Sequence, residues 1–132
     1  MRRNFITLLL AVVLAAMAAC QTNVSRKVGI EQALFSFEKT LRWRSVRESY
    51  KYVADDVRPP HLPSWVDTVK VVGYEVLDPA AEIQRNTVVQ TAEIRYVHTD
   101  TQIMRTLVDE QVWTSPDDGK TWQRANPMPD FY

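Results

Sequence analysis

The amino-acid sequence predicts an α+β fold in which an N-terminal helix pair packs on a mainly antiparallel four-stranded sheet. Between residues 28 and 53 apolar residues recur every three or four positions, as on one face of a helix, whereas from residue 69 onward they tend to alternate. Pro59, Pro60 and Pro63 separate the two regions, and proline cannot continue a helix because it lacks the amide donor. We therefore expect helices first and strands after them.

The first twenty residues have the features of an export signal. Arg2 and Arg3 precede an uncharged apolar run over residues 5–18, which is shorter than the roughly twenty apolar residues of a membrane span. The run ends in Met17-Ala18-Ala19-Cys20, which resembles the lipobox of bacterial lipoproteins. This resemblance implies that residues 1–19 are a cleaved signal peptide and that Cys20 receives a diacylglyceryl group and an acylated amino terminus. The alternative is a conventional leader with an incidental cysteine.

A lipidated Cys20 would make the membrane the first partner of this chain. Two acyl chains already give stable anchoring, and a mature lipoprotein carries three. Gln21 follows the cysteine, where the sorting signal of enteric bacteria uses aspartate for inner-membrane retention, so we expect the outer membrane and a domain facing the periplasm. Residues 21–27 are polar and aperiodic, so residues 20–27 are predicted to be the lipidated cysteine and a tether, which spans about 25 Å when extended.

Residues 28–132 have the length of a single domain. The chain has 16 basic and 16 acidic residues, and removal of Arg2 and Arg3 leaves 14 against 16. Because these charges are interspersed, the sequence does not indicate a basic face for nucleic acid. Cys20 is the only cysteine, so its lipidation would leave no thiol for a disulfide and the domain must be held together by packing.

The helical region divides into two stripes of apolar residues. The first stripe has spacings of four, three and four, and the second begins out of phase with it, so we expect a boundary near Arg44. Ser45 and Glu48 match a capping box at the start of the second helix. A single bent helix is the alternative. The stripes consist of Ile30, Leu34, Phe37 and Leu41, and of Val46, Tyr50 and Val53.

Four strands are predicted after a loop at residues 57–66, where Trp65 covers the edge of the core. They span residues 69–77, 87–98, 103–114 and 121–124, with turns at Asp78-Pro79, at Thr99-Asp100 and around Asp118-Gly119. A two-residue turn at 99–100 would pair Tyr96 with Ile103, and the last turn would pair Ser115 with Trp122. The face toward the helices then contains Ala92, Ile94, Tyr96, Ile103, Leu107 and Trp113, and the outer face contains Thr91, Glu93, Arg95, Thr106 and Glu110.

Several short segments are similar to small secreted bacterial members of the nuclear-transport-factor-like, or cystatin-like cone, superfamily. They are residues 41–45 and 50–53, then Gln111-Val112-Trp113, residues 118–122 and the proline-bracketed tail at 127–131. The resemblance implies a curved sheet that forms a cone with the helices, and sheet-to-sheet dimers. The superfamily includes isomerases, cyclases, dehydratases and many members without catalysis, so the fold alone does not give an activity.

Four inward residues are candidates for a pocket: Tyr96, Arg105, Asp109 and Gln111. Asp109 opposite Gln90, with Arg105 one pleat away, has the residue types of a proton-transfer site, but an ion pair at the rim of a filled core explains them as well. They match no catalytic motif of the isomerase-like members, so we assign no catalytic residue. His61 and His98 do not have the spacing of a zinc site, and we expect no metal and no cofactor.

The sequence therefore predicts a lipid-anchored, non-catalytic binding or structural module of the cell envelope. Its expected partners are the membrane, an envelope protein and a second copy of the chain. The alternative is a small-ligand carrier or isomerase-like enzyme that uses Asp109 and Tyr96 inside the cone. A third hypothesis, polysaccharide contact, requires Trp43 and Trp65 to lie flat on the surface.

Overall fold

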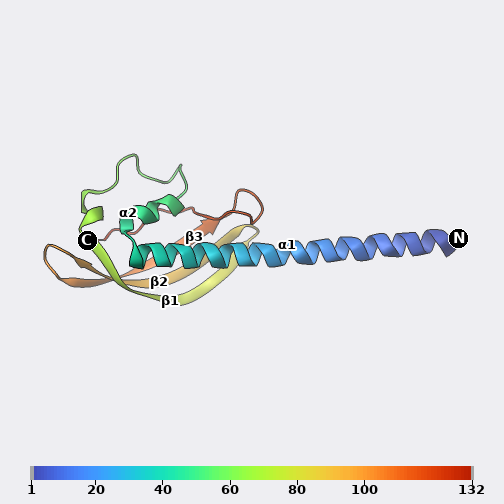
Figure 1. Ribbon diagram of the computed structural model, residues 1–132, viewed down its shortest axis with the longest axis horizontal. Helices are drawn as coiled ribbons and strands as arrows, with labels where there is room; N and C mark the ends of the chain where they lie inside the picture. The colour runs from blue at the N-terminus through green and yellow to red at the C-terminus, as the bar shows by residue number, and fades with distance from the viewer. Residues whose placement is uncertain (1, 132) are drawn as a thin grey trace.

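A computed structural model describes residues 2–131 and has one long helix lying along a four-stranded antiparallel sheet (Figure 1). Helix α1 packs on the curved sheet with its C-terminal half, while its N-terminal half extends away from the sheet (Figure 1). The strands are hydrogen-bonded in the order β1-β2-β3-β4, which confirms the predicted α+β class with helices on an antiparallel sheet. The elements are α1 (Arg2–Trp43), α2 (Val46–Ser49), the 3₁₀ turns η1 (Tyr50–Tyr52) and η2 (Ser64–Asp67), β1 (Val69–Gln84), β2 (Thr87–His98), β3 (Met104–Thr114) and β4 (Gln123–Arg124).

The boundary between the helices lies where the change of stripe predicts it. Helix α1 ends at Trp43, and Ser45 is the N-cap of α2, with its side chain accepting a 3.0 Å hydrogen bond from the backbone N–H of Glu48. The alternative of a single bent helix is therefore wrong.

The beginning of α1 differs from the prediction, because residues 21–27 are helical instead of forming an irregular tether. Arg26 attaches this part of the helix to the sheet. Its guanidinium donates to Glu82 Oε1 at 2.8 Å and to Asn86 Oδ1 at 3.2 Å, so the helix is held against the end of the β1–β2 hairpin before residue 28. The side chain of Cys20, the predicted lipidation site, lies outside the described side chains.

Strand β1 is longer than predicted. It continues through Asp78-Pro79 to Gln84, with irregular pairing between Val76 and Asp78 and again between Asp78 and Ala81. Proline is tolerated here because β1 is at the edge of the sheet, where a strand needs hydrogen bonds on one side only. The predicted turn at this position is therefore an irregular stretch of an edge strand.

The two later turns test the predicted register. The β2–β3 loop is longer than two residues, so Tyr96 pairs with Arg105 and not with Ile103, and Ile103 is exposed. A shift by two residues leaves the paired side chains of β2 and β3 on their predicted faces. Ile103, which was predicted to face the helices, precedes β3 and is exposed. At the last turn Trp113 pairs with Arg124, which is the predicted register.

The core lies between α1 and the inner face of the sheet, as predicted. Phe37 of α1 and Trp113 of β3 are fully buried, and their rings meet edge to face at 5.4 Å. Phe131 is also fully buried, and its ring contacts those of Tyr96 and Trp65 at 5.1 and 5.6 Å. The C-terminal segment therefore completes the core.

Candidate functional site

The structure separates the four residues predicted to line a pocket. Asp109 and Gln111 are both buried on the inner face of β3, where Gln111 Nε2 donates to Asp109 Oδ2 at 3.0 Å. Tyr96 is buried on β2, and its ring packs against Phe131. Arg105 is exposed near the beginning of β3, opposite Tyr96. Asp109 pairs with Ala92 in the ladder, and not with Gln90 as predicted.

The main partner of Asp109 is Arg124, which the sequence analysis did not single out. The two side chains form a bidentate ion pair, with Arg124 Nη1 at 2.7 Å from Oδ2 and Nη2 at 2.6 Å from Oδ1. Both are almost fully buried, with side-chain exposures of 1% and 2%. The sequence did indicate that Arg124 points inward. Side chains two residues apart on a strand lie on the same face, and Arg124 follows the inward Trp122 by two residues on the strand that pairs with β3.

A polar network extends from this ion pair across the sheet. Gln111 Nε2 also donates to the hydroxyl of Tyr74 at 2.7 Å, and Gln90 Nε2 donates to the same hydroxyl at 3.2 Å. Burial raises the pKa of Tyr74 to about 12, although the hydrogen bond from Gln111 opposes this rise. The phenol is therefore neutral at physiological pH. The indole Nε1 of Trp113 donates to Gln111 Oε1 at 3.2 Å and closes the network.

This geometry favours a structural role for Asp109 over a role in proton transfer. A general base needs a free acceptor position facing its substrate. The carboxylate of Asp109 already accepts three hydrogen bonds, two of them from a guanidinium, and charge-assisted bonds of this kind are about twice as strong as neutral ones. Arg124 in turn donates to the carbonyl oxygens of Asn126 and Pro127 at 3.1 and 2.8 Å, so the pair also holds the C-terminal segment.

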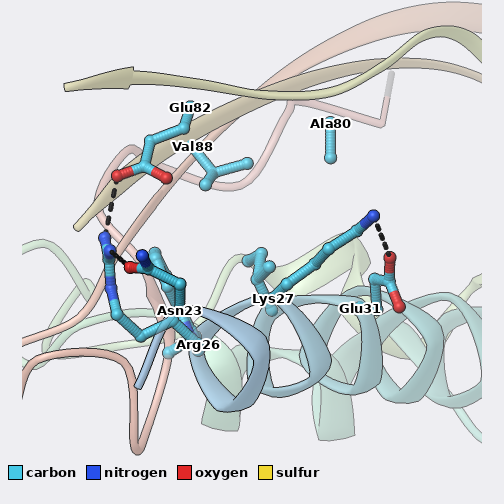
Figure 2. Close-up of a pocket in the computed structure, with 9 residues that line it drawn as sticks. Asn23, Arg26, Lys27, Glu31, Ala80, Glu82 and Val88 are labelled. Atoms are coloured by element: carbon cyan, nitrogen blue, oxygen red, sulfur yellow. Dashed lines mark hydrogen bonds and ion pairs between the residues drawn. The ribbon is translucent and has the colours of Figure 1, made fainter. Parts of the chain in front are cut away.

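A groove of about 530 Å³ lies elsewhere, between the first turns of the packed part of α1 and the end of the β1–β2 hairpin (Figure 2). Ion pairs occupy its polar positions: Arg26 reaches across to Glu82, and Lys27 Nζ lies 4.0 Å from Glu31 on the same helix (Figure 2). The size is within the range of small-ligand sites. The groove is lined by Asn23, Arg26, Lys27, Ile30, Glu31, Ala80, Glu82, Val88 and Trp122.

The other candidate groups do not come together in the structure. His61 is exposed on the proline loop, and the ring of His98 packs against Tyr96 at 5.9 Å. Within residues 2–131, as far as their side chains are described, no three His, Cys, Asp or Glu residues are grouped so as to hold a metal ion. Of the two tryptophans proposed for polysaccharide contact, Trp43 is exposed, whereas Trp65 is partly buried against Phe131.

In the part of the chain that the structure describes, none of the helices has the length and apolar character needed to cross a membrane. Comparison of the chain with known protein families, with curated proteins and with solved structures found no match.

Proposed function

We propose that this chain is a bacterial lipoprotein, anchored by lipid on Cys20 and facing the periplasm, whose domain is a non-catalytic binding or structural module of the cell envelope. One observation carries the proposal, namely the succession of Arg2-Arg3, an uncharged apolar run and Met17-Ala18-Ala19-Cys20. Each part matches a step of lipoprotein export, and the cysteine is at the position that would be acylated. Residues 1–19 are then the cleaved signal peptide, and Gln21 favours the outer membrane.

The packing near Cys20 is consistent with an anchor placed at this position. Arg26, only six residues further along the chain, is held by Glu82 and Asn86. Gly29 approaches the last hairpin so closely that a Cβ there would lie 2.7 Å from the carbonyl oxygen of Gly119. The lipid would therefore be attached close to a fixed point of the fold, and the domain would remain close to the bilayer.

The interior of the domain supports a non-catalytic role. We assign the fold to the cystatin-like cone type, in which enzymes place their acid or base inside the cone. The inner position here is taken by Asp109, which binds Arg124 and Gln111, and the neighbouring space is filled by side chains such as Trp113. These contacts weigh against the alternative of an isomerase-like enzyme or carrier that uses Asp109 and Tyr96.

The outer face of the sheet is the surface we propose for an envelope partner or a second copy of the chain. Met104 and Val108 of β3 are exposed there, in the same alternation as the polar Thr106 and Glu110. An exposed apolar patch that is rimmed by polar residues marks a protein–protein interaction site, and we propose that Met104 and Val108 belong to such a patch.

The proposed function is tested by the chemistry at Cys20. Cells that produce the wild-type chain or the Cys20→Ala variant are labelled with radioactive palmitate, and the mass of the N-terminal peptide is measured. We expect label, cleavage before residue 20 and membrane fractionation in the wild type only. An unlabelled wild-type chain would exclude the proposal. Crosslinking of both forms in intact cells would then show whether an envelope protein is bound only by the anchored form.

A further inference from the structure

Helix α1 has an apolar face that the sheet does not cover. Val24, Val28, Phe35 and Trp43 are between 54% and 71% exposed, and we call these four residues the outer stripe. With 3.6 residues per turn they fall within an arc of about 100° on the helix. The residues that pack on the sheet, Ile30, Leu34, Phe37 and Leu41, lie on another side of the same helix. Helix α1 is therefore apolar on two sides, and only one of them has a partner in the fold.

Basic residues accompany the outer stripe. Residues 20–44 contain five basic and two acidic residues, whereas residues 45–132 contain nine basic and fourteen acidic residues. The two acids, Glu31 and Glu38, lie 4.0 and 3.4 Å from Lys27 and Arg42 of the same helix. The ion pairs of the described residues leave Lys39 and Arg44 without an acidic partner, and both are exposed. The excess of positive charge in an otherwise acidic domain thus lies in residues 20–44, on α1 and on Arg44, which directly follows it.

We propose that the outer stripe lies in the interface of an anionic phospholipid bilayer, with α1 parallel to the membrane plane. An interfacial helix of this kind has Trp, Phe and aliphatic residues on one face, flanked by Lys and Arg that contact phosphate groups. The outer stripe provides the apolar face, and Lys39 on α1 and Arg44 directly after it provide the basic residues. Trp43 has the aromatic type that is enriched at the level of lipid headgroups. The proposal rests on the proposed anchor at Cys20, because that position precedes Val24 by four residues, about one helical turn.

Charge favours a lipid surface over a second copy of the same helix. Pairing of two outer stripes would bring two helices with an excess of positive charge together, and like charges in contact oppose association. An anionic bilayer has the complementary charge. This orientation also leaves the outer face of the sheet free for another partner, because that face and the outer stripe are on different sides of the molecule.

The test uses the chain purified from cell membranes and reconstituted into vesicles of phosphatidylethanolamine and phosphatidylglycerol. Phe35→Cys and, as a matched control, Val108→Cys each introduce one thiol for an environment-sensitive fluorophore. The two native residues are apolar and nearly equally exposed, at 64% and 61%. We expect lipids with brominated acyl chains to quench the label at position 35 several-fold more than the label at position 108. Equal quenching at both positions would overturn the proposal, and so would a label at position 35 that is shielded from water but not quenched by lipid.

The charge dependence is tested in the Phe35→Cys background. Lys39→Glu with Arg44→Glu should reduce the lipid quenching in phosphatidylglycerol vesicles, whereas Lys70→Glu with Lys120→Glu changes the net charge equally and should leave it unchanged. An equal effect of both pairs would contradict a specific contact of α1. The mass of the N-terminal peptide separates the two proposals. Lipid on Cys20 without quenching at position 35 rejects the interfacial helix alone. Quenching that is stronger in Phe35→Cys than in Val108→Cys, without lipid on Cys20, rejects the anchor alone.

Discussion

The buried ion pair allows a quantitative prediction for Arg124→Met. Arg124 is 1% exposed and makes two bonds to Asp109 and two to backbone carbonyls of the C-terminal segment. The substitution leaves a buried carboxylate with only the 3.0 Å hydrogen bond from Gln111. Loss of one partner of a buried pair costs about 3–5 kcal/mol, a large fraction of the 5–15 kcal/mol by which a domain is typically stable. We therefore expect the free energy of unfolding to fall by about 3–5 kcal/mol.

A double variant separates the ion pair from the other contacts of Arg124. Asp109→Val with Arg124→Met removes both charges, and replacement of a buried pair by apolar residues is often close to neutral. The carbonyl oxygens of Asn126 and Pro127 still lose their donor, and an unsatisfied buried group costs about 1–3 kcal/mol. The double variant should therefore be more stable than Arg124→Met alone, but less stable than the wild type.

Urea unfolding measures these differences. The fully buried Trp113, whose indole donates to Gln111 within the same network, supplies the fluorescence signal. A loss below about 1 kcal/mol for Arg124→Met would fall in the range of an exposed pair and would refute the reasoning. A double variant no more stable than the single one would show that the tail contacts, and not the unpaired carboxylate, account for the loss.

Three further predictions concern local contacts. Gly29→Ala gains about 1 kcal/mol because alanine has the higher helix propensity. Its Cβ would lie 2.7 Å from the carbonyl oxygen of Gly119, so we expect the free energy of unfolding, measured with urea, to fall by about 1–2 kcal/mol in total. A more stable variant would contradict this close approach. Ser45→Ala removes the N-cap hydrogen bond of α2 and should lower the free energy of unfolding by about 1 kcal/mol. Ser64→Ala is the control, because Ser64 begins η2, which has no side-chain cap, and its loss should have a smaller effect. The folded-state pKa of Tyr74, about 12, exceeds its ordinary value of 10. The neutral phenol therefore stabilises the fold fully below pH 10, and this stabilisation is lost as the pH rises toward 12. Over that range the wild type should lose up to about 3 kcal/mol more than Tyr74→Phe, and parallel pH profiles of the two proteins would be evidence against a buried phenol.

Local turn chemistry explains which parts of the sheet could be predicted. At the last hairpin Asp118 and Gly119 have φ values of 58° and 93°, the backbone that an Asp-Gly pair favours, and the predicted register is correct. At the preceding turn Gln102 also adopts a positive φ, of 58°, although glutamine does not indicate such a conformation in a sequence. The prediction placed a two-residue turn there, and the ladder was wrong by two residues.

Contacts between distant residues explain what the sequence analysis missed. The attachment of residues 21–27 to the sheet depends on Arg26 meeting Glu82, which lies 56 residues away along the chain. Arg124 and Asp109 are 15 residues apart and are brought together only by the β3–β4 pairing. Periodicity identifies the inward face on which Asp109 lies, but it does not show that the carboxylate there has a buried partner. The alternation therefore placed Asp109 and Gln111 on the inner face, whereas the ion pair of Asp109 with Arg124 came only from the structure.

Burial of Phe131 has a consequence for the order in which the domain folds. The rings of Tyr96 and Trp65 pack on this residue, so the hydrophobic centre is complete only when residue 131 has joined it. A polypeptide synthesised only as far as β4 would leave both rings without this partner. The sheet and the helices can therefore form before the segment after β4, but the core closes last.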